Sequence, residues 1–168
     1  MNELVVEEFR EYVTARHAAL YRSAVLLTGN RQDAEDLLQT ALARLAARWQ
    51  TIQRTGSPDA YVRKAMYHQR ISWWRLRRNR QEYALPEVPA DGDLAADTAL
   101  RLALASVLRQ LTPKQRAVVI LRYYDDLPEG EVAAILGCSV GTVRSQTHRT
   151  LARLRELCAE MASTKELI

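Results

Sequence analysis

Apolar residues recur at intervals of three and four along most of the chain, which is the spacing of amphipathic α-helices. The first such segment runs from Glu7 to Leu27 and is ended by Thr28-Gly29-Asn30. The side chain of Asn30 can cap a second helix, which we expect to continue to about Trp49. The N-terminal part of the chain is therefore predicted to be helical, without the alternating strands and helices of an α/β domain.

A basic helix follows a short polar segment. Residues 50–57 are polar with one glycine and are predicted to form a loop, after which Pro58 can restart a helix. From Ala60 to Arg80 the chain holds seven basic residues and no acidic ones. Residues 81–98 then contain two prolines, one glycine and five acids without helical periodicity. This composition predicts a flexible acidic linker.

Helical spacing resumes after the linker. Residues 99–110 carry an apolar stripe, and Thr112-Pro113 can cap and start a further helix that reaches Tyr123. Asp125-Asp126 is expected to turn the chain. The pattern predicts an all-α protein of two small helical domains, residues 1–80 and 99–168, joined by a linker over residues 81–98.

The segment from Leu127 to Arg155 predicts a helix-turn-helix. Gly137 can take the left-handed conformation that ends one helix, and Ser139 can cap the next through its side-chain oxygen. The residues expected to face the first helix are Val143, Thr147, Leu151 and Leu154. The outer surface then carries polar and basic residues suited to a DNA major groove: Thr142, Arg144, Ser145, Gln146, His148, Arg149 and Arg153.

An ordinary αα-hairpin with a solvated arginine face is the alternative interpretation of this segment. The short turn and the small polar residues that begin the second helix favour DNA binding instead. No acid occurs between Glu131 and Glu156, which favours it further. A helix-turn-helix alone still leaves many DNA-binding functions open.

The distribution of charge separates the two domains from the linker. The net charge is +4, but residues 1–80 hold fourteen Lys and Arg against eight Asp and Glu, and residues 101–168 hold ten against seven. Residues 81–100 hold five acids and no base. Because clustered bases bind phosphates through counterion release, we expect two modules that face nucleic acid, flanking a connector that does not.

Aromatic residues are interleaved with the bases of the helix over residues 60–80. Arginines can hold phosphates while rings stack on unstacked bases, a combination suited to single-stranded or melting DNA. Tyr61, Ala65 and Ile71 are expected to be partly structural. The residues predicted to contact DNA are Arg63, Lys64, Tyr67, His68, Arg70, Trp73, Trp74, Arg75, Arg77 and Arg78.

Composition narrows the remaining function classes. Cys138 and Cys158 form no C-x-x-C motif and the three histidines form no recognisable ligand set, so we expect no zinc, no structural disulfide and no cofactor. We find no apolar run long enough to span a bilayer and no signal peptide, from which we expect a cytoplasmic protein.

The order of these segments resembles a group 4, or extracytoplasmic-function, sigma factor of bacterial RNA polymerase, over nearly the whole chain. DAEDLLQTALARL from Asp33 is similar to region 2.2 of that family, and the basic aromatic helix resembles regions 2.3 and 2.4. LTPKQRAVVILRYYDDLPEGEVAAILGCSVGTVRSQTHRTLARLR resembles regions 4.1 and 4.2. GTVRSQT followed by RTLARLR is most similar to the actinobacterial SigE-family subgroup.

The resemblance implies a non-enzymatic initiation factor whose partners are core RNA polymerase, promoter DNA and an anti-sigma factor. The N-terminal domain would bind the polymerase clamp and the minus-10 element, with residues 50–57 capturing a flipped base. The C-terminal domain would bind the minus-35 element and the polymerase flap. By resemblance, the clamp-binding residues are Asp33, Glu35, Asp36, Leu38 and Gln39. Three residues depart from the family pattern: His68, where the family commonly has Asn, and Gln146 and Thr147. These departures bear on which promoter sequence the protein would recognise.

Four alternatives stay open beside this interpretation. The acids at the start of the second helix can be explained by favourable interaction with the helix dipole alone. The linker is either a tether that sets the distance between the domains or an acidic mimic of RNA in the polymerase channel. A transcriptional activator with a similar C-terminal domain would begin with a sensory or receiver domain, which the pattern of residues 1–80 disfavours. An enzyme acting on nucleic acid would need a set of convergent catalytic groups, and none stands out.

Overall fold

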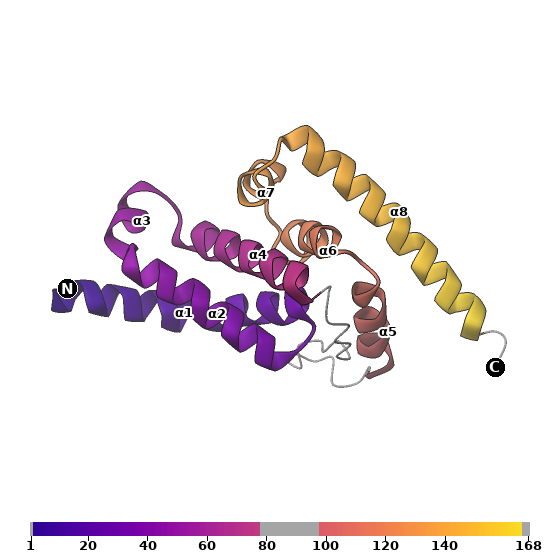
Figure 1. The fold of residues 1–168 in the computed structure, drawn as a ribbon, viewed down its shortest axis with the longest axis horizontal. Helices are drawn as coiled ribbons and strands as arrows, with labels where there is room; N and C mark the ends of the chain where they lie inside the picture. The colour runs from indigo at the N-terminus through magenta and orange to yellow at the C-terminus, as the bar shows by residue number, and fades with distance from the viewer. Residues whose placement is uncertain (1, 78–97, 166–168) are drawn as a thin grey trace. The chain divides into compact units, whose positions relative to one another are not determined.

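The computed structural model describes residues 2–77 and 98–165, with the backbone alone for residues 77, 98–102 and 165. All secondary structure in these ranges is helical, which confirms the all-α prediction. The helices, drawn in Figure 1, are α1 (Glu3–Thr28), α2 (Arg31–Ala47), α3 (Trp49–Thr55), α4 (Pro58–Arg77), α5 (Thr98–Arg109), α6 (Pro113–Val119), a π-helix η2 (Ile120–Tyr124), α7 (Glu129–Leu136) and α8 (Val140–Lys165).

The chain divides into two compact units, residues 1–89 and 90–168. The dividing point lies in the stretch for which we predicted a linker, and that stretch, apart from Thr98, lies outside the described residues. The predicted boundaries at residues 80 and 98 and the flexibility of the linker therefore stay predictions.

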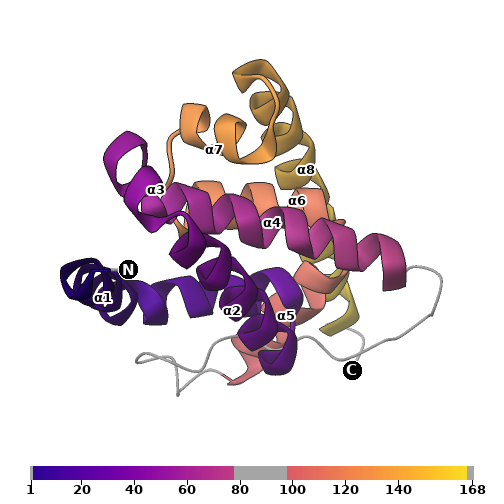
Figure 2. The same cartoon turned by 60° about the vertical axis from the view of Figure 1, so that its left-hand side comes forward.

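In the first unit, α2 packs between α1 and α4 (Figure 2). Gly29 ends α1 in the left-handed conformation, with φ of 82°, and the Asn30 side chain accepts the Asp33 backbone N–H at 2.8 Å to cap α2. Both local predictions are confirmed. The core is built from apolar residues that each of the three helices turns inward, including Leu20, Leu37, Leu45, Val62 and Met66.

The expected loop over residues 50–57 is wrong in part, because Trp49–Thr55 forms the short helix α3. Trp49 is only 4% exposed, and its ring centroid lies 5.3 Å from those of both Phe9 and Tyr12 on α1. Because the Trp49 ring is packed in the core, the start of this polar segment is held in place. The segment itself has no apolar periodicity from which a helix could be predicted.

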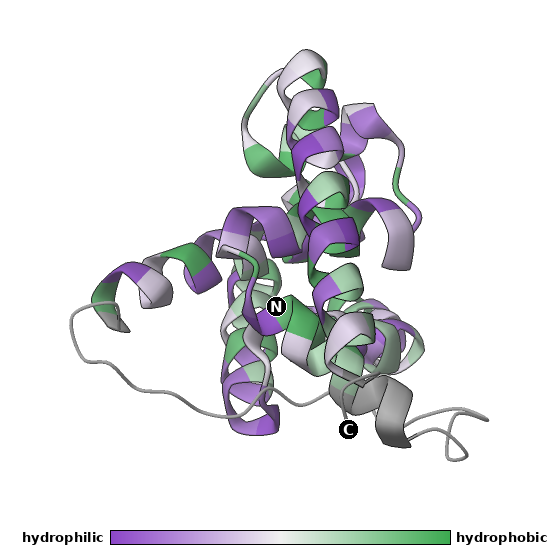
Figure 3. Ribbon diagram, turned by 90° about the vertical axis from the view of Figure 1, so that its right-hand side faces the viewer, coloured by the Kyte–Doolittle hydropathy of each residue, from purple (hydrophilic) through white to green (hydrophobic). Residues whose placement is uncertain are grey.

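In the second unit, α6 and α7 pack against α8. Thr112 and Gln115 form a reciprocal capping box at the start of α6, as the Thr112-Pro113 pair predicted. The π-helix η2 was not predicted, and the turn expected at Asp125-Asp126 is confirmed by a φ of 53° at Asp126. Figure 3 colours the helices by hydropathy and shows that they carry both hydrophilic and hydrophobic residues, as expected for helices that pack on one face and meet solvent on the other.

Candidate nucleic-acid and partner interfaces

The predicted helix-turn-helix is formed by α7 and the first half of α8. Gly137 ends α7 with φ of 67°, and the Cys138 backbone N–H donates to the Ala133 carbonyl at 3.1 Å. The Ser139 hydroxyl accepts the Thr142 backbone N–H at 3.1 Å. The structure therefore confirms the predicted turn at Gly137 and the predicted cap at Ser139.

One side of α8 is packed and the other is open to solvent. Its packed side follows residues 143, 147, 150, 154 and 157, of which Val143, Thr150 and Leu157 are fully buried. Thr147, Leu151 and Leu154 are half-buried, so the predicted packed side is nearly right. Of the predicted DNA-binding residues, the exposed ones are Thr142, Arg144, Ser145, His148 and Arg149, and the half-buried ones are Gln146 and Arg153.

Two arginines of this outer surface have acidic neighbours. Nε of Arg144 donates to a carboxylate oxygen of Glu129 at 2.8 Å, across the turn from α7. Nη1 of Arg153 donates to Glu156 at 3.2 Å, one turn further along α8. Both pairs are at the surface, where such contacts add little to stability.

Part of the predicted DNA-contacting surface of α4 faces inward. Arg63 is 7% exposed and its Nη1 lies 3.2 Å from a carboxylate oxygen of Asp59. Tyr67 is 5% exposed, with its ring edge-on to that of His68 at 5.3 Å. Both side chains lie next to Val62 and Met66 on the side of α4 that is buried in the unit. The contact of Arg63 and Tyr67 with DNA stays a prediction, and it would require this side of α4 to open.

The other predicted residues of α4 lie nearer to solvent. Lys64, His68 and Arg75 are exposed, and Arg70, Trp73 and Trp74 are half-buried. Nε of Arg70 donates to the Leu27 carbonyl at 3.0 Å, which ties α4 to the end of α1. Although His68 is exposed, partial desolvation of its ring and the charge of Lys64 lower its pKa, which favours the neutral imidazole. The Arg77 side chain and Arg78 lie outside what the structure describes.

A polar cluster between α1 and the start of α4 was missed by the sequence analysis. The Tyr12 hydroxyl donates to Asp59 at 2.8 Å. Arg16 pairs with the same carboxylate through Nε, at 3.2 Å, and through Nη2. Arg63 completes the cluster from within α4. One signal could have found it: Asp59 is the only acid between Asp36 and Glu82, in a strongly basic stretch.

The electrostatics of this cluster favour an ionised Asp59. Burial raises the pKa of Asp59, but hydrogen bonds from Arg16 and Tyr12, with the charges of Arg16 and Arg63, outweigh it and hold the pKa below its ordinary value. Burial, followed by the hydrogen bond and charge of Asp59, raises the pKa of Tyr12 well above its usual range. The phenol therefore stays protonated and keeps its hydrogen bond to the carboxylate.

The predicted clamp-binding residues of α2 divide between surface and core. Glu35, Asp36 and Gln39 are exposed. Asp33 is half-buried and accepts the Asn30 side-chain amide at 2.9 Å, so it helps to cap the helix. Leu38 is 1% exposed and packs in the core of the unit, so its contact with a partner stays a prediction.

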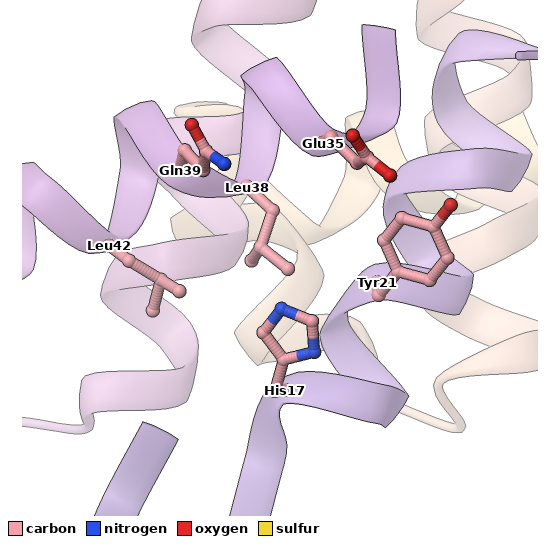
Figure 4. A pocket seen from close by; sticks show the side chains of 6 residues that line it. All are labelled: His17, Tyr21, Glu35, Leu38, Gln39 and Leu42. Atoms are coloured by element: carbon pink, nitrogen blue, oxygen red, sulfur yellow. The ribbon is translucent and has the colours of Figure 1, made fainter. Parts of the chain in front are cut away.

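A hollow of about 370 Å³ lies between α1 and this part of α2 (Figure 4). It is lined by His17, Tyr21, Glu35, Leu38, Gln39 and Leu42. The rings of His17 and Tyr21 are nearly parallel at 6.1 Å, one helical turn apart. Its edge thus combines stacked rings with the exposed polar ends of Glu35 and Gln39.

Residues 2–77 and 98–165 contain no group of three or more His, Cys, Asp or Glu side chains able to hold a metal ion. Cys138 is half-buried and Cys158 is exposed, both as free thiols. Among the helices that the structure describes, none has the length and hydropathy needed to cross a bilayer.

Comparison with known proteins agrees with the division into two units. Residues 12–80 match the family model described as Sigma-70 region 2, and residues 101–154 match Sigma-70, region 4. The chain is 50% identical over 153 residues to the RNA polymerase sigma-E factor of Streptomyces coelicolor, covering 90% of this chain and 86% of that protein. It is 44% identical over 158 residues to the sigma-E factor of Streptomyces antibioticus, covering 90% and 84%.

Solved structures share the fold at lower identity. The sigma factor RpoE in complex with the anti-sigma factor NepR from Bartonella quintana has a TM-score of 0.73 at 24% identity, covering 91% of this chain and 98% of that one. CnrH in complex with the cytosolic domain of CnrY has a TM-score of 0.65 at 23% identity, covering 90% and 88%. Both family regions are matched in order, and half of the aligned residues are identical to those of a sigma-E factor. The chain therefore belongs to the sigma-70 family of RNA polymerase sigma factors, among those of the extracytoplasmic-function type.

Proposed function

We propose that this protein binds core RNA polymerase and directs transcription initiation at promoters that carry its minus-10 and minus-35 elements. The observation that carries the proposal is the outer face of α8, which presents Arg144, Ser145 and Arg149 to solvent directly after a short helix-turn-helix turn. Side chains at this place in a helix-turn-helix can reach base edges in the major groove.

The first unit supplies the surfaces for polymerase and for melted DNA. Glu35, Asp36 and Gln39 on α2 offer acidic and polar groups to a basic partner surface, which suits the polymerase clamp. On α4, Lys64 and Arg75 can hold phosphates, while the partly exposed rings of Trp73 and Trp74 can stack on unstacked bases. The α3 segment and the turn at Gly56-Ser57 are the proposed site for a flipped base.

The same proposal gives the protein no catalytic step of its own, because its work is binding and positioning while the polymerase makes RNA. A cytoplasmic location goes with this role. An anti-sigma factor is a further proposed partner, since the similar sigma factor RpoE is in complex with the anti-sigma factor NepR.

Co-migration with core polymerase tests the first half of the proposal. Purified full-length protein and core polymerase from an actinobacterium should elute as one complex in size-exclusion chromatography. The complex should then protect promoter fragments from nuclease digestion over two separate elements. Separate elution of the two proteins at micromolar concentration would contradict the proposal.

A further inference from the structure

The ion pair between Glu129 and Arg144 links the two helices of the helix-turn-helix on their exposed side. Glu129 opens α7, and its Oε2 accepts Nε of Arg144 at 2.8 Å, from a residue on the second turn of α8. The Arg144 side chain is 69% exposed and that of Glu129 is 33% exposed. Since solvent screens a pair this open, its contribution to folding is small.

The geometry of the pair leaves the far end of the guanidinium unoccupied. Among the described residues, Glu129 is the sole hydrogen-bond partner of Arg144, and the bond uses Nε alone. The two terminal nitrogens of Arg144 keep their N–H groups, which can donate in parallel to two acceptors. Guanine presents such a pair, O6 and N7, in the major groove.

We propose that Glu129 is a positioning residue that aims Arg144 at a guanine and so sets sequence selectivity at one base pair of the upstream promoter element. The inference rests on the proposed function, because it assumes that α8 enters the DNA groove. Glu129 itself need not touch DNA. It acts by holding the guanidinium of Arg144 in one orientation.

Two physical effects give Glu129 this role. A long arginine side chain that is already oriented loses less conformational freedom on binding. More of the free energy of its contact with the base is then available to discriminate guanine from the other bases. The Glu129 carboxylate also repels nearby phosphates and offsets the charge of Arg144. A phosphate therefore competes less well than a guanine for the free end of the guanidinium.

Glu131 provides a matched control in the same helical turn. It is exposed, carries the same charge at the same end of α7, and makes no hydrogen bond or ion pair within the described residues. Glu131→Gln and Glu129→Gln therefore remove the same charge from the same region. Only the second removes the contact that orients Arg144.

Transcription by the holoenzyme, reconstituted from the full chain and core polymerase, tests the inference. The probe is a pool of promoter templates whose upstream element is randomised, and sequencing of the RNA gives the base preference at each position. We expect the wild type to prefer guanine at one position by about tenfold, and Arg144→Ala to abolish that preference. Glu129→Gln should reduce the same preference about threefold or more and leave other positions unchanged.

The controls separate positioning from general electrostatics and from unfolding. Glu131→Gln should keep the full preference, and Glu129→Gln combined with Arg144→Ala should match Arg144→Ala alone. A wild-type preference in Glu129→Gln, or an equal loss in Glu131→Gln, would overturn the inference. Unfolding would lower transcription from every template alike, and such a uniform loss also counts against it. A wild type that prefers no base in the upstream element would instead refute the proposed function.

Discussion

Replacing Asp59 with asparagine should destabilise the first unit, because this carboxylate is the acceptor that joins α1 to α4. In the folded chain it accepts hydrogen bonds from Tyr12, Arg16 and Arg63, and Arg63 is almost fully buried. Asparagine keeps the shape and one acceptor oxygen but loses the charge. A hydrogen bond to a charged group contributes about 1.5–3 kcal/mol, and a surface pair much less.

The exposure of the partners sets the expected size of the effect. The Asp59 side chain is 27% exposed and that of Arg16 is 39% exposed, so solvent screens the Arg16 pair more than the Arg63 pair. We therefore expect Asp59→Asn to lower the free energy of unfolding by about 2 kcal/mol. For a unit of this size, that loss corresponds to a fall in Tm of roughly 8–16 °C.

Tryptophan emission can follow this unit within the full chain. All three tryptophans, Trp49, Trp73 and Trp74, lie in residues 1–89, so urea unfolding monitored by their fluorescence reports on that unit. Glu7→Gln is the matched control, because it removes a carboxylate from an exposed pair with Arg10 on α1. Its effect should stay within about 0.5 kcal/mol.

The pH dependence gives an independent check. The folded-state pKa of Asp59 lies below its ordinary value of 3.8, so its stabilising effect is fully present above that value and is lost as pH falls through the folded pKa. The difference in unfolding free energy between wild type and Asp59→Asn should be constant between about pH 5 and pH 7, and should shrink below about pH 4. A loss no larger than that of Glu7→Gln, or a difference that does not change with pH, would refute the reasoning.

Three further predictions concern binding. Asp36→Arg should weaken binding to core polymerase in a pull-down titration without changing the unfolding curve, because Asp36 is exposed on α2; an unchanged affinity would remove the clamp assignment. Arg149→Ala should cost about 1–3 kcal/mol in minus-35 recognition if the side chain contacts a guanine, whereas a phosphate contact would weaken all sequences alike and lower the salt slope. Replacing the five acids of residues 81–98 by amides should weaken core binding in a salt-dependent way if they mimic RNA; wild-type abortive and full-length transcripts at low and high salt would leave only a tether.

Features fixed by near neighbours in the chain could be predicted from the sequence. The Asn30 and Thr112 caps and the left-handed Gly137 each depend on residues within a few positions, and the structure has all three. The outer face of α8 could be predicted for the same reason, because helical periodicity alone separates its packed side from its solvent side.

Features that depend on distant partners could not be predicted. The helix Trp49–Thr55 begins at a ring that packs on Phe9 and Tyr12 of α1. Two of the three partners of Asp59, Tyr12 and Arg16, lie more than forty residues away in the chain. Arg63 and Tyr67 looked like a DNA surface because bases and aromatic residues alternate there. Val62 and Met66 are apolar residues four positions apart, which predicts that they lie on the buried side of α4. Arg63 and Tyr67 directly follow them at the same spacing, which is consistent with their burial.

The most direct test of the function is transcription in vitro from genomic fragments by core polymerase with and without the full chain. The account predicts transcripts with defined 5′ ends that appear only when the protein is added and that share two elements upstream of each start. Binding to core polymerase without any new, defined 5′ end would contradict the central claim that this chain directs promoter-specific initiation.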